Sequence, residues 1–75
     1  RMNIQEKVIA LLAEHLEIDP SEITAQTTFE DLDVDSLDTV EILMDMEDKF
    51  GMEIKFEEAG KSVADLVAYL EAHKE

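Results

Sequence analysis

Residues 36–50, SLDTVEILMDMEDKF, form the most strongly patterned segment of the chain. Apolar side chains recur in this segment at a spacing that an α-helix, turning about 100° per residue, places on one face. The face consists of Thr39, Ile42, Leu43, Met46 and Phe50. Gly51 follows directly, and glycine is the residue that most often ends a helix. The segment therefore predicts a helix that begins at Asp35 or Ser36, ends near Gly51 and packs one face into a core.

The same helix carries more apolar residues than one face requires. A second stripe, Leu37, Val40 and Met44, lies roughly a quarter-turn or more from the first. Acidic residues surround it: Asp38, Glu41, Asp45, Glu47 and Asp48. Burial under a neighbouring segment and exposure as a protein-docking surface are both open for this stripe. The acidic rim favours docking, and methionine suits contact with partners of different shape.

The flanking sequence predicts two further main helices and one short one. Asn3 and Glu6 match a capping box, and apolar residues then recur at helical spacing to about Leu16. Ser62 is the second cap candidate. It precedes an apolar face made of Leu66, Val67, Tyr69 and Leu70. With a helical turn expected at residues 57–59, the predicted fold is all-α, a small four-helix bundle of three main helices and one short helix.

Residues 19–35 have no sustained period and predict a long ordered loop between the first two main helices. We expect three apolar anchors for it, Ile23, Phe29 and Leu32, and a helical turn at residues 28–32. Loops of this length are uncommon in compact domains and are often functional.

Composition limits the function. The 75 residues include 20 acidic and 6 basic side chains, a formal net charge of −14 at pH 7, and no cysteine. This charge repels nucleic acids and anionic membranes and attracts basic patches on other proteins. Because no apolar run could span a bilayer and no signal peptide is visible, we expect a cytoplasmic protein without membrane insertion. We expect one domain over residues 1–75, with Arg1 an expression remnant.

Ser36 stands at the start of the central helix, and three roles are open to it. Serine in this place is most often only an N-cap. A catalytic nucleophile would need a base, whereas the two histidines, His15 and His73, lie near the ends of the other main helices. The glycines of a nucleophile elbow are also missing, since Val34 and Asp38 occupy their places. We therefore predict a non-enzyme, in which Ser36 is a cap or the acceptor of a modification made by another enzyme.

A calcium loop beginning at Asp31 is not expected. Asp31, Asp33 and Asp35 match three of its ligand positions, but Ser36 and Ile42 replace the required glycine and glutamate. No dedicated metal site is predicted. Loose divalent binding remains open among four acids: Glu30, Asp31, Asp35 and Asp38.

Residues 29–41, FEDLDVDSLDTVE, resemble the acyl carrier proteins of type II, dissociated fatty acid synthesis. The similarity continues at Phe50-Gly51 and over residues 63–70, so it covers essentially the whole chain. The resemblance implies a four-helix bundle, expected to be a monomer, with 4′-phosphopantetheine joined to Ser36. A phosphopantetheinyl transferase would attach this arm from coenzyme A with the help of Asp35, which makes the chain a phosphoprotein. The arm would deliver acyl intermediates as thioesters to the enzymes of fatty acid synthesis.

The resemblance also implies two sets of contact residues. The docking surface, recognised by basic patches on partner enzymes, would consist of Leu37, Asp38, Val40, Glu41, Met44, Glu47 and Asp48. The acyl pocket would be lined by Leu43, Met46, Ile54 and Ala59.

The chain departs from the family pattern in three places. Asp33 stands where glycine is usual, Lys55 replaces a common proline, and residues 59–63 are about two residues shorter. Two other functions stay open. One is a carrier for a specialised pathway (polyketide, aminoacyl or lipid-tailoring), and the other is an acidic adaptor that binds its partners non-covalently.

Overall fold

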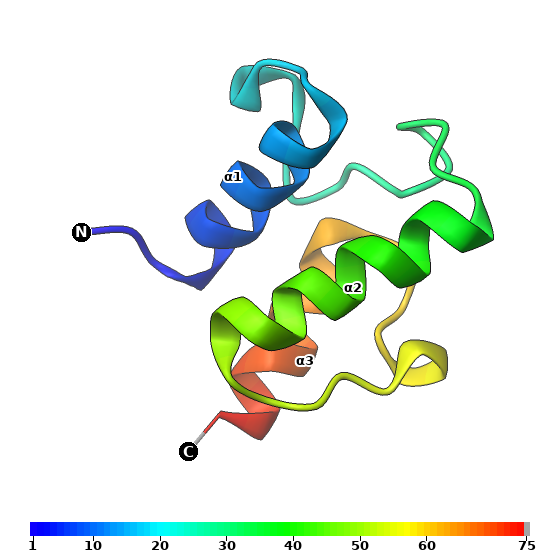
Figure 1. The fold of residues 1–75 in the computed structure, drawn as a ribbon. Coiled ribbons are helices and arrows are strands. Elements are labelled where there is room, and N and C mark those ends of the chain that lie inside the picture. Colours follow the sequence, from blue (N-terminus) through cyan, green and yellow to red (C-terminus); the bar gives the residue numbers. More distant parts are fainter. Residues whose placement is uncertain (75) are drawn as a thin grey trace.

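The computed structural model describes residues 1–74, and in this part of the chain it contains three α-helices and two short turns of 3-10 helix (Figure 1). The elements, in order, are α1 (Ile4–Leu16), η1 (Pro20–Glu22), α2 (Ser36–Phe50), η2 (Phe56–Glu58) and α3 (Val63–His73). The all-α prediction is confirmed. No helix between residues 1 and 74 combines the length and the apolar character needed to cross a membrane.

Two expected short helices differ in detail from the structure. The fourth helix is a single 3-10 turn, η2, which begins one residue earlier than the predicted range. Residues 29–33 form hydrogen-bonded turns in place of the helical turn expected at residues 28–32. Both segments are too short for the cooperative hydrogen bonding that an α-helix requires.

Side-chain caps fix the starts of α1 and α3, as the sequence predicts. Asn3 Oδ1 accepts a hydrogen bond from Glu6 N at 2.8 Å, and Glu6 Oε1 accepts one from Asn3 N at 3.0 Å. Ser62 Oγ accepts a hydrogen bond from Asp65 N at 3.1 Å. Such caps satisfy amides that have no partner within the helix, so they set where each helix begins.

The cap of α2 is Asp35, whose Oδ1 accepts a hydrogen bond from Asp38 N at 2.8 Å. Ser36 is therefore the first helical residue. Gly51 ends the helix in the left-handed region, with φ at 67°, and its amide donates to Glu47 O at 2.8 Å. Glycine adopts this conformation without the steric cost that other residues incur.

The core lies between the three α-helices and is almost entirely aliphatic. Its most deeply buried large side chains come from every main helix: Val8, Leu12, Ile42, Leu43, Met46, Val63, Leu66 and Leu70. Each contributes about 1.5–3 kcal/mol by leaving water. The predicted core face of α2 is thus confirmed for Ile42, Leu43 and Met46, whereas Thr39 and Phe50, at its two ends, are only half-buried.

The long loop before α2 is held in place by main-chain hydrogen bonds to the segment that leads into α3. Val63 N donates to Thr27 O at 2.9 Å, Phe29 N to Lys61 O at 3.0 Å and Ala64 N to Ala25 O at 2.9 Å. We call these three bonds, between residues 25–29 and 61–64, the loop pairing. They explain why a loop without a sequence period is ordered, because its polar backbone is satisfied by a distant segment.

Apolar side chains also hold the loop before α2 against the core. Ile23 and Phe29 are buried in the core, and Leu32 is half-buried against it, as the sequence predicts. The loop pairing and these anchors together fix the start of α2 relative to the start of α3 (Figure 1).

A tight turn at residues 60–62 brings the α3 side of the loop pairing into position. Gly60 has φ at 82°, and a Cβ atom there would overlap the side chain of Asp65. Asp65 Oδ2 accepts hydrogen bonds from Lys61 N at 3.0 Å and from Ser62 N at 3.2 Å. These bonds favour the ionised carboxylate and so lower the pKa of Asp65. The bond from the Lys61 amide has the largest effect.

The Asp65 carboxylate should stabilise the fold in a pH-dependent way. Because its pKa is lower in the folded chain, its contribution is fully present above the unfolded value of about 3.9 and is lost as the pH falls through the folded value. Asp65→Asn should therefore lower the free energy of unfolding at pH 7, and the difference from the parent chain should narrow below about pH 4. Urea denaturation followed by circular dichroism at pH 7, 5 and 3 measures this difference.

The matched control is Glu71→Gln, which removes the same charge from an exposed position on α3. For Glu71→Gln, the difference in the free energy of unfolding from the parent chain should not narrow at low pH. If this difference depends on pH equally in both variants, the role given to Asp65 is contradicted.

Candidate functional site

Ser36 is exposed at the first position of α2, and its side chain is free. Because Asp35 provides the cap, the interpretation of Ser36 as the N-cap does not hold. In the part of the chain that the structure describes, Ser36 Oγ makes no hydrogen bond, and the amides of Ser36 and Leu37 have no acceptor. The site therefore offers an unengaged hydroxyl beside two free N–H donors, an arrangement that suits an attached anion.

The turn before Ser36 accommodates the unusual Asp33. This residue has φ at 58°, in the left-handed region that glycine adopts most easily. Aspartate tolerates this region better than most residues. Asp33 thus keeps the left-handed backbone conformation that a glycine at this position would adopt easily, and it adds one carboxylate to the turn.

The acids around Ser36 do not form a metal site. Asp31 is engaged within the loop, since its Oδ2 accepts from Thr28 N at 3.1 Å while its amide donates to Thr28 Oγ1 at 2.9 Å. Nowhere in residues 1–74 do three or more carboxylate, imidazole or thiol groups lie close enough together to hold a metal ion. Glu30, Asp31, Asp35 and Asp38 therefore do not form a group of that size, and loose divalent binding among them stays a prediction.

Within residues 1–74, no histidine forms a hydrogen bond with Ser36 Oγ. His73 stacks on Tyr69 with ring centroids 4.1 Å apart, and its Nδ1 lies 2.9 Å from Tyr69 O. It lines a hollow with Phe50 and Gly51, at the opposite end of α2 from Ser36. In the described residues a nucleophilic Ser36 therefore lacks the bonded histidine that would activate it.

The second stripe of α2 faces solvent. Leu37 is 70% exposed and Met44 is 53% exposed, while Val40 is half-buried. Three of the predicted docking acids are exposed around them: Asp38, Glu41 and Asp48. Exposed apolar side chains within an acidic rim match the surface expected from the sequence, although its use by partners stays a prediction.

Glu47 has a structural contact that the sequence did not reveal. Its Oε2 accepts a hydrogen bond from Ile54 N at 2.8 Å in a half-buried position. This bond ties the segment after α2 back to the helix, and charged hydrogen bonds of this kind contribute about 1.5–3 kcal/mol. A functional loss in a Glu47 variant would therefore reflect stability as well as docking.

The four residues predicted to line an acyl pocket lie together in the core. Leu43, Met46, Ile54 and Ala59 are each between 0% and 2% exposed and belong to one cluster. Protein interiors are close-packed, so an acyl chain entering here would have to separate these side chains. Their role as pocket lining stays a prediction.

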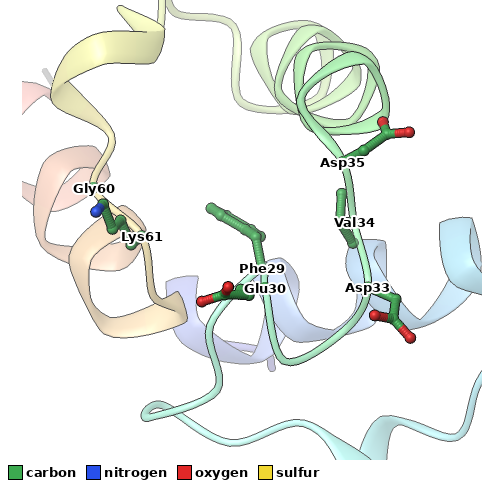
Figure 2. Close-up of a pocket in the computed structure, with 7 residues that line it drawn as sticks. All are labelled: Phe29, Glu30, Asp33, Val34, Asp35, Gly60 and Lys61. Atoms are coloured by element: carbon green, nitrogen blue, oxygen red, sulfur yellow. The ribbon is translucent and has the colours of Figure 1, made fainter.

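A hollow beside Ser36 was not foreseen from the sequence (Figure 2). Its lining comes from two distant segments: Phe29, Glu30, Asp33, Val34, Asp35, Gly60 and Lys61. The loop pairing joins them, through the bond between Phe29 N and Lys61 O. No periodicity or motif in a single sequence signals a contact of this range.

Comparison with known proteins connects this geometry to a family. The model of the phosphopantetheine attachment site matches residues 6–70, a span that contains Ser36 and both walls of the hollow. The acyl carrier protein of Streptococcus pneumoniae serotype 4 is 46% identical over 70 residues, which cover 93% of this chain and 95% of that protein. The acyl carrier protein of Lactococcus lactis subsp. cremoris is 44% identical over 73 residues, 97% of this chain and all of that protein.

The chain belongs to the acyl carrier protein family. As a member of this family it is a carrier and not an enzyme, and its cofactor is covalent 4′-phosphopantetheine. The residues present fit this group. An exposed, unbonded hydroxyl can accept the phosphodiester, and the free amides at the start of α2 favour its negative charge.

Proposed function

We propose that Ser36 carries the 4′-phosphopantetheine arm and that the chain delivers acyl thioesters to the enzymes of fatty acid synthesis. The observation that supports this proposal best is the exposed Ser36 side chain without a hydrogen-bond partner in the described chain. The other two serines are less suited. Ser62 Oγ caps α3, and Ser21 lies in η1, where its amide donates to Asp19 Oδ1.

The position of Ser36 determines how the arm is held. A phosphodiester on its oxygen lies next to the free amides of the helix start, which stabilise the anion. The carboxylates of Asp35 and Asp38 oppose it, so the arm is not bound tightly at its base. Because no histidine bonds the hydroxyl in residues 1–74, we expect the transferase to remove the hydroxyl proton when the arm is attached. Once attached, the arm supplies a terminal thiol on which acyl groups are carried.

The docking surface supports a role with basic partners. Leu37 and Met44 provide an exposed apolar centre, and Asp38, Glu41 and Asp48 provide a negative rim. Such a pattern raises encounter rates with a positively charged patch in a salt-dependent manner, and the apolar centre then limits dissociation. The transferase and the synthesis enzymes can both use it because it lies on the same helix as Ser36.

Loading of the arm tests the attachment residue. Incubation of the apo-chain with coenzyme A, magnesium and a broad-specificity phosphopantetheinyl transferase should add the mass of one phosphopantetheine, as measured by intact mass spectrometry. Ser36→Ala should abolish the gain, whereas Ser21→Ala and Ser62→Ala should retain it. The acyl carrier protein of Streptococcus pneumoniae serves as the positive control. Loading of Ser36→Ala, or no loading of the parent chain when the control is loaded, would contradict the proposal and leave the non-covalent adaptor in its place.

Acyl transfer tests the docking surface. Glu41→Lys and Met44→Ala should lower kcat/KM of a fatty acid synthesis enzyme for the acylated carrier by about five- to thirtyfold, as interface residues worth 1–2 kcal/mol do. Both side chains are exposed, so the free energy of unfolding should change by less than about 0.5 kcal/mol.

Glu14→Lys makes the same charge reversal at an exposed position of α1 and is the matched control. If this variant slows transfer as much as Glu41→Lys does, net charge and not the surface of α2 would account for the effect.

A further inference from the structure

The four methionines of the chain differ strongly in exposure. Met44, on α2, is 53% exposed, and Met2, before α1, is 49% exposed. Met52 is half-buried, whereas Met46 is 0% exposed in the core. An oxidant dissolved in water must reach the sulfur atom before it can react with it. Met44 and Met2 are therefore open to oxidation, and Met46 is shielded as long as the bundle stays folded.

Met44 lies inside the docking surface, whereas Met2 does not. Residues three or four positions apart are neighbours on one face of a helix, so Val40, Glu41 and Asp48 flank Met44. Both of these acids are exposed. Met2 instead lines a hollow together with residues of α1 and the end of α2. One exposed thioether thus belongs to the apolar centre that partners would cover, and the other offers an internal comparison.

A peroxide changes this centre with a single oxygen atom. The sulfur donates an electron pair to one peroxide oxygen, the O–O bond breaks, and the second oxygen leaves as water. The sulfur is thereby oxidised by two electrons, and the flexible apolar thioether becomes a polar sulfoxide. Its oxygen accepts hydrogen bonds from water and must give them up when a partner covers the surface, which opposes docking.

The carrier offers the sulfoxide little compensation. The charged neighbours of Met44 are carboxylates, which accept hydrogen bonds and do not donate them. Lys49 is the cation within α2, and its Nζ is paired with Asp45 Oδ1 at 3.2 Å. The loss of apolar character at Met44 is therefore felt in the contact with the partner.

We propose that Met44 is an oxidation site, at which a peroxide reversibly weakens docking of the carrier to its partner enzymes. The inference rests on the proposed function, because it requires the docking surface to be used. Reversal needs a methionine sulfoxide reductase and a dithiol. The dithiol is oxidised to a disulfide, the sulfoxide oxygen leaves as water and the thioether is restored.

Peptide mass spectrometry tests the selectivity of oxidation. The chain has no cysteine, so before the arm is attached its sulfur atoms are those of the methionines alone. The apo-chain is treated with hydrogen peroxide at pH 7, and samples are stopped with catalase. Met44 should gain oxygen as readily as Met2. Met46 should react at least about tenfold more slowly, because its sulfur is reached only when the bundle opens. Equal rates at Met44 and Met46 would overturn the inference.

Acyl transfer tests the consequence for docking. The oxidised chain is freed of peroxide, loaded from coenzyme A to completion as verified by intact mass, and acylated. Its kcat/KM with a fatty acid synthesis enzyme should be about three- to tenfold lower than that of the untreated chain. Treatment with methionine sulfoxide reductases for both epimers and dithiothreitol before loading should restore the value.

Two matched variants assign the effect to one sulfur atom. Met2→Leu is oxidised at Met44 and should lose as much activity as the parent chain. Met44→Leu keeps an apolar side chain in the docking surface and is oxidised at Met2, so peroxide should leave its own kcat/KM unchanged. A loss in peroxide-treated Met44→Leu would place the effect elsewhere and overturn the inference.

The remaining outcomes separate the inference from the proposed function. A treated parent chain that transfers acyl groups at the untreated rate would overturn the inference and leave the proposed function intact. Loss of the helical circular dichroism signal on oxidation would show general damage and would also overturn it. An untreated chain that neither loads nor transfers would overturn the proposed function and the inference with it.

Discussion

The loop pairing is the constraint on which the site depends. Three main-chain hydrogen bonds, from Val63, Phe29 and Ala64 to the carbonyls of Thr27, Lys61 and Ala25, hold a loop that has no helical period of its own. Because the loop ends at the Asp35 cap, its position determines where α2 begins and where Ser36 faces. The same bonds bring Gly60 and Lys61 to one wall of a hollow whose other wall includes Asp35, the residue before the serine. The proposed attachment residue, the hollow and the start of α3 therefore depend on one small set of contacts.

The central helix α2 serves two purposes because its apolar residues fall on two faces. Ile42, Leu43 and Met46 are buried and hold the bundle together, while Leu37 and Met44 remain exposed. Small domains bury little surface, so leaving two large apolar side chains in water reduces a limited stability. This cost is consistent with a surface that partners cover. Glu47 does not fit this separation into a core face and a docking face. Its carboxylate accepts a hydrogen bond from Ile54 N, so it stabilises the fold and is also part of the acidic rim.

The sequence predicted what is decided locally. Helix periodicity, the Asn3 and Ser62 caps and the Gly51 terminus all depend on residues within a few positions of one another, and the structure confirms them. The loop pairing, the bond from Ile54 N to Glu47 and the hollow join residues that lie further apart, and a single sequence does not indicate their register. For Ser36, spacing alone left cap and acceptor open. The structure excludes the cap, because Asp35 takes that place, and the acceptor role stays a proposal.

Amide hydrogen exchange at single-residue resolution tests the loop pairing most directly. The amides of Phe29, Val63 and Ala64 should have protection factors within about tenfold of that of Leu66, whose amide donates to Ser62 O at the start of α3 at 3.1 Å, because they open only when the bundle does. The amide of Leu37, which has no acceptor in the described chain, gives the unprotected reference. Exchange of Phe29, Val63 and Ala64 at the rate of Leu37 would show that the loop moves freely, and would contradict the claim that it positions Ser36.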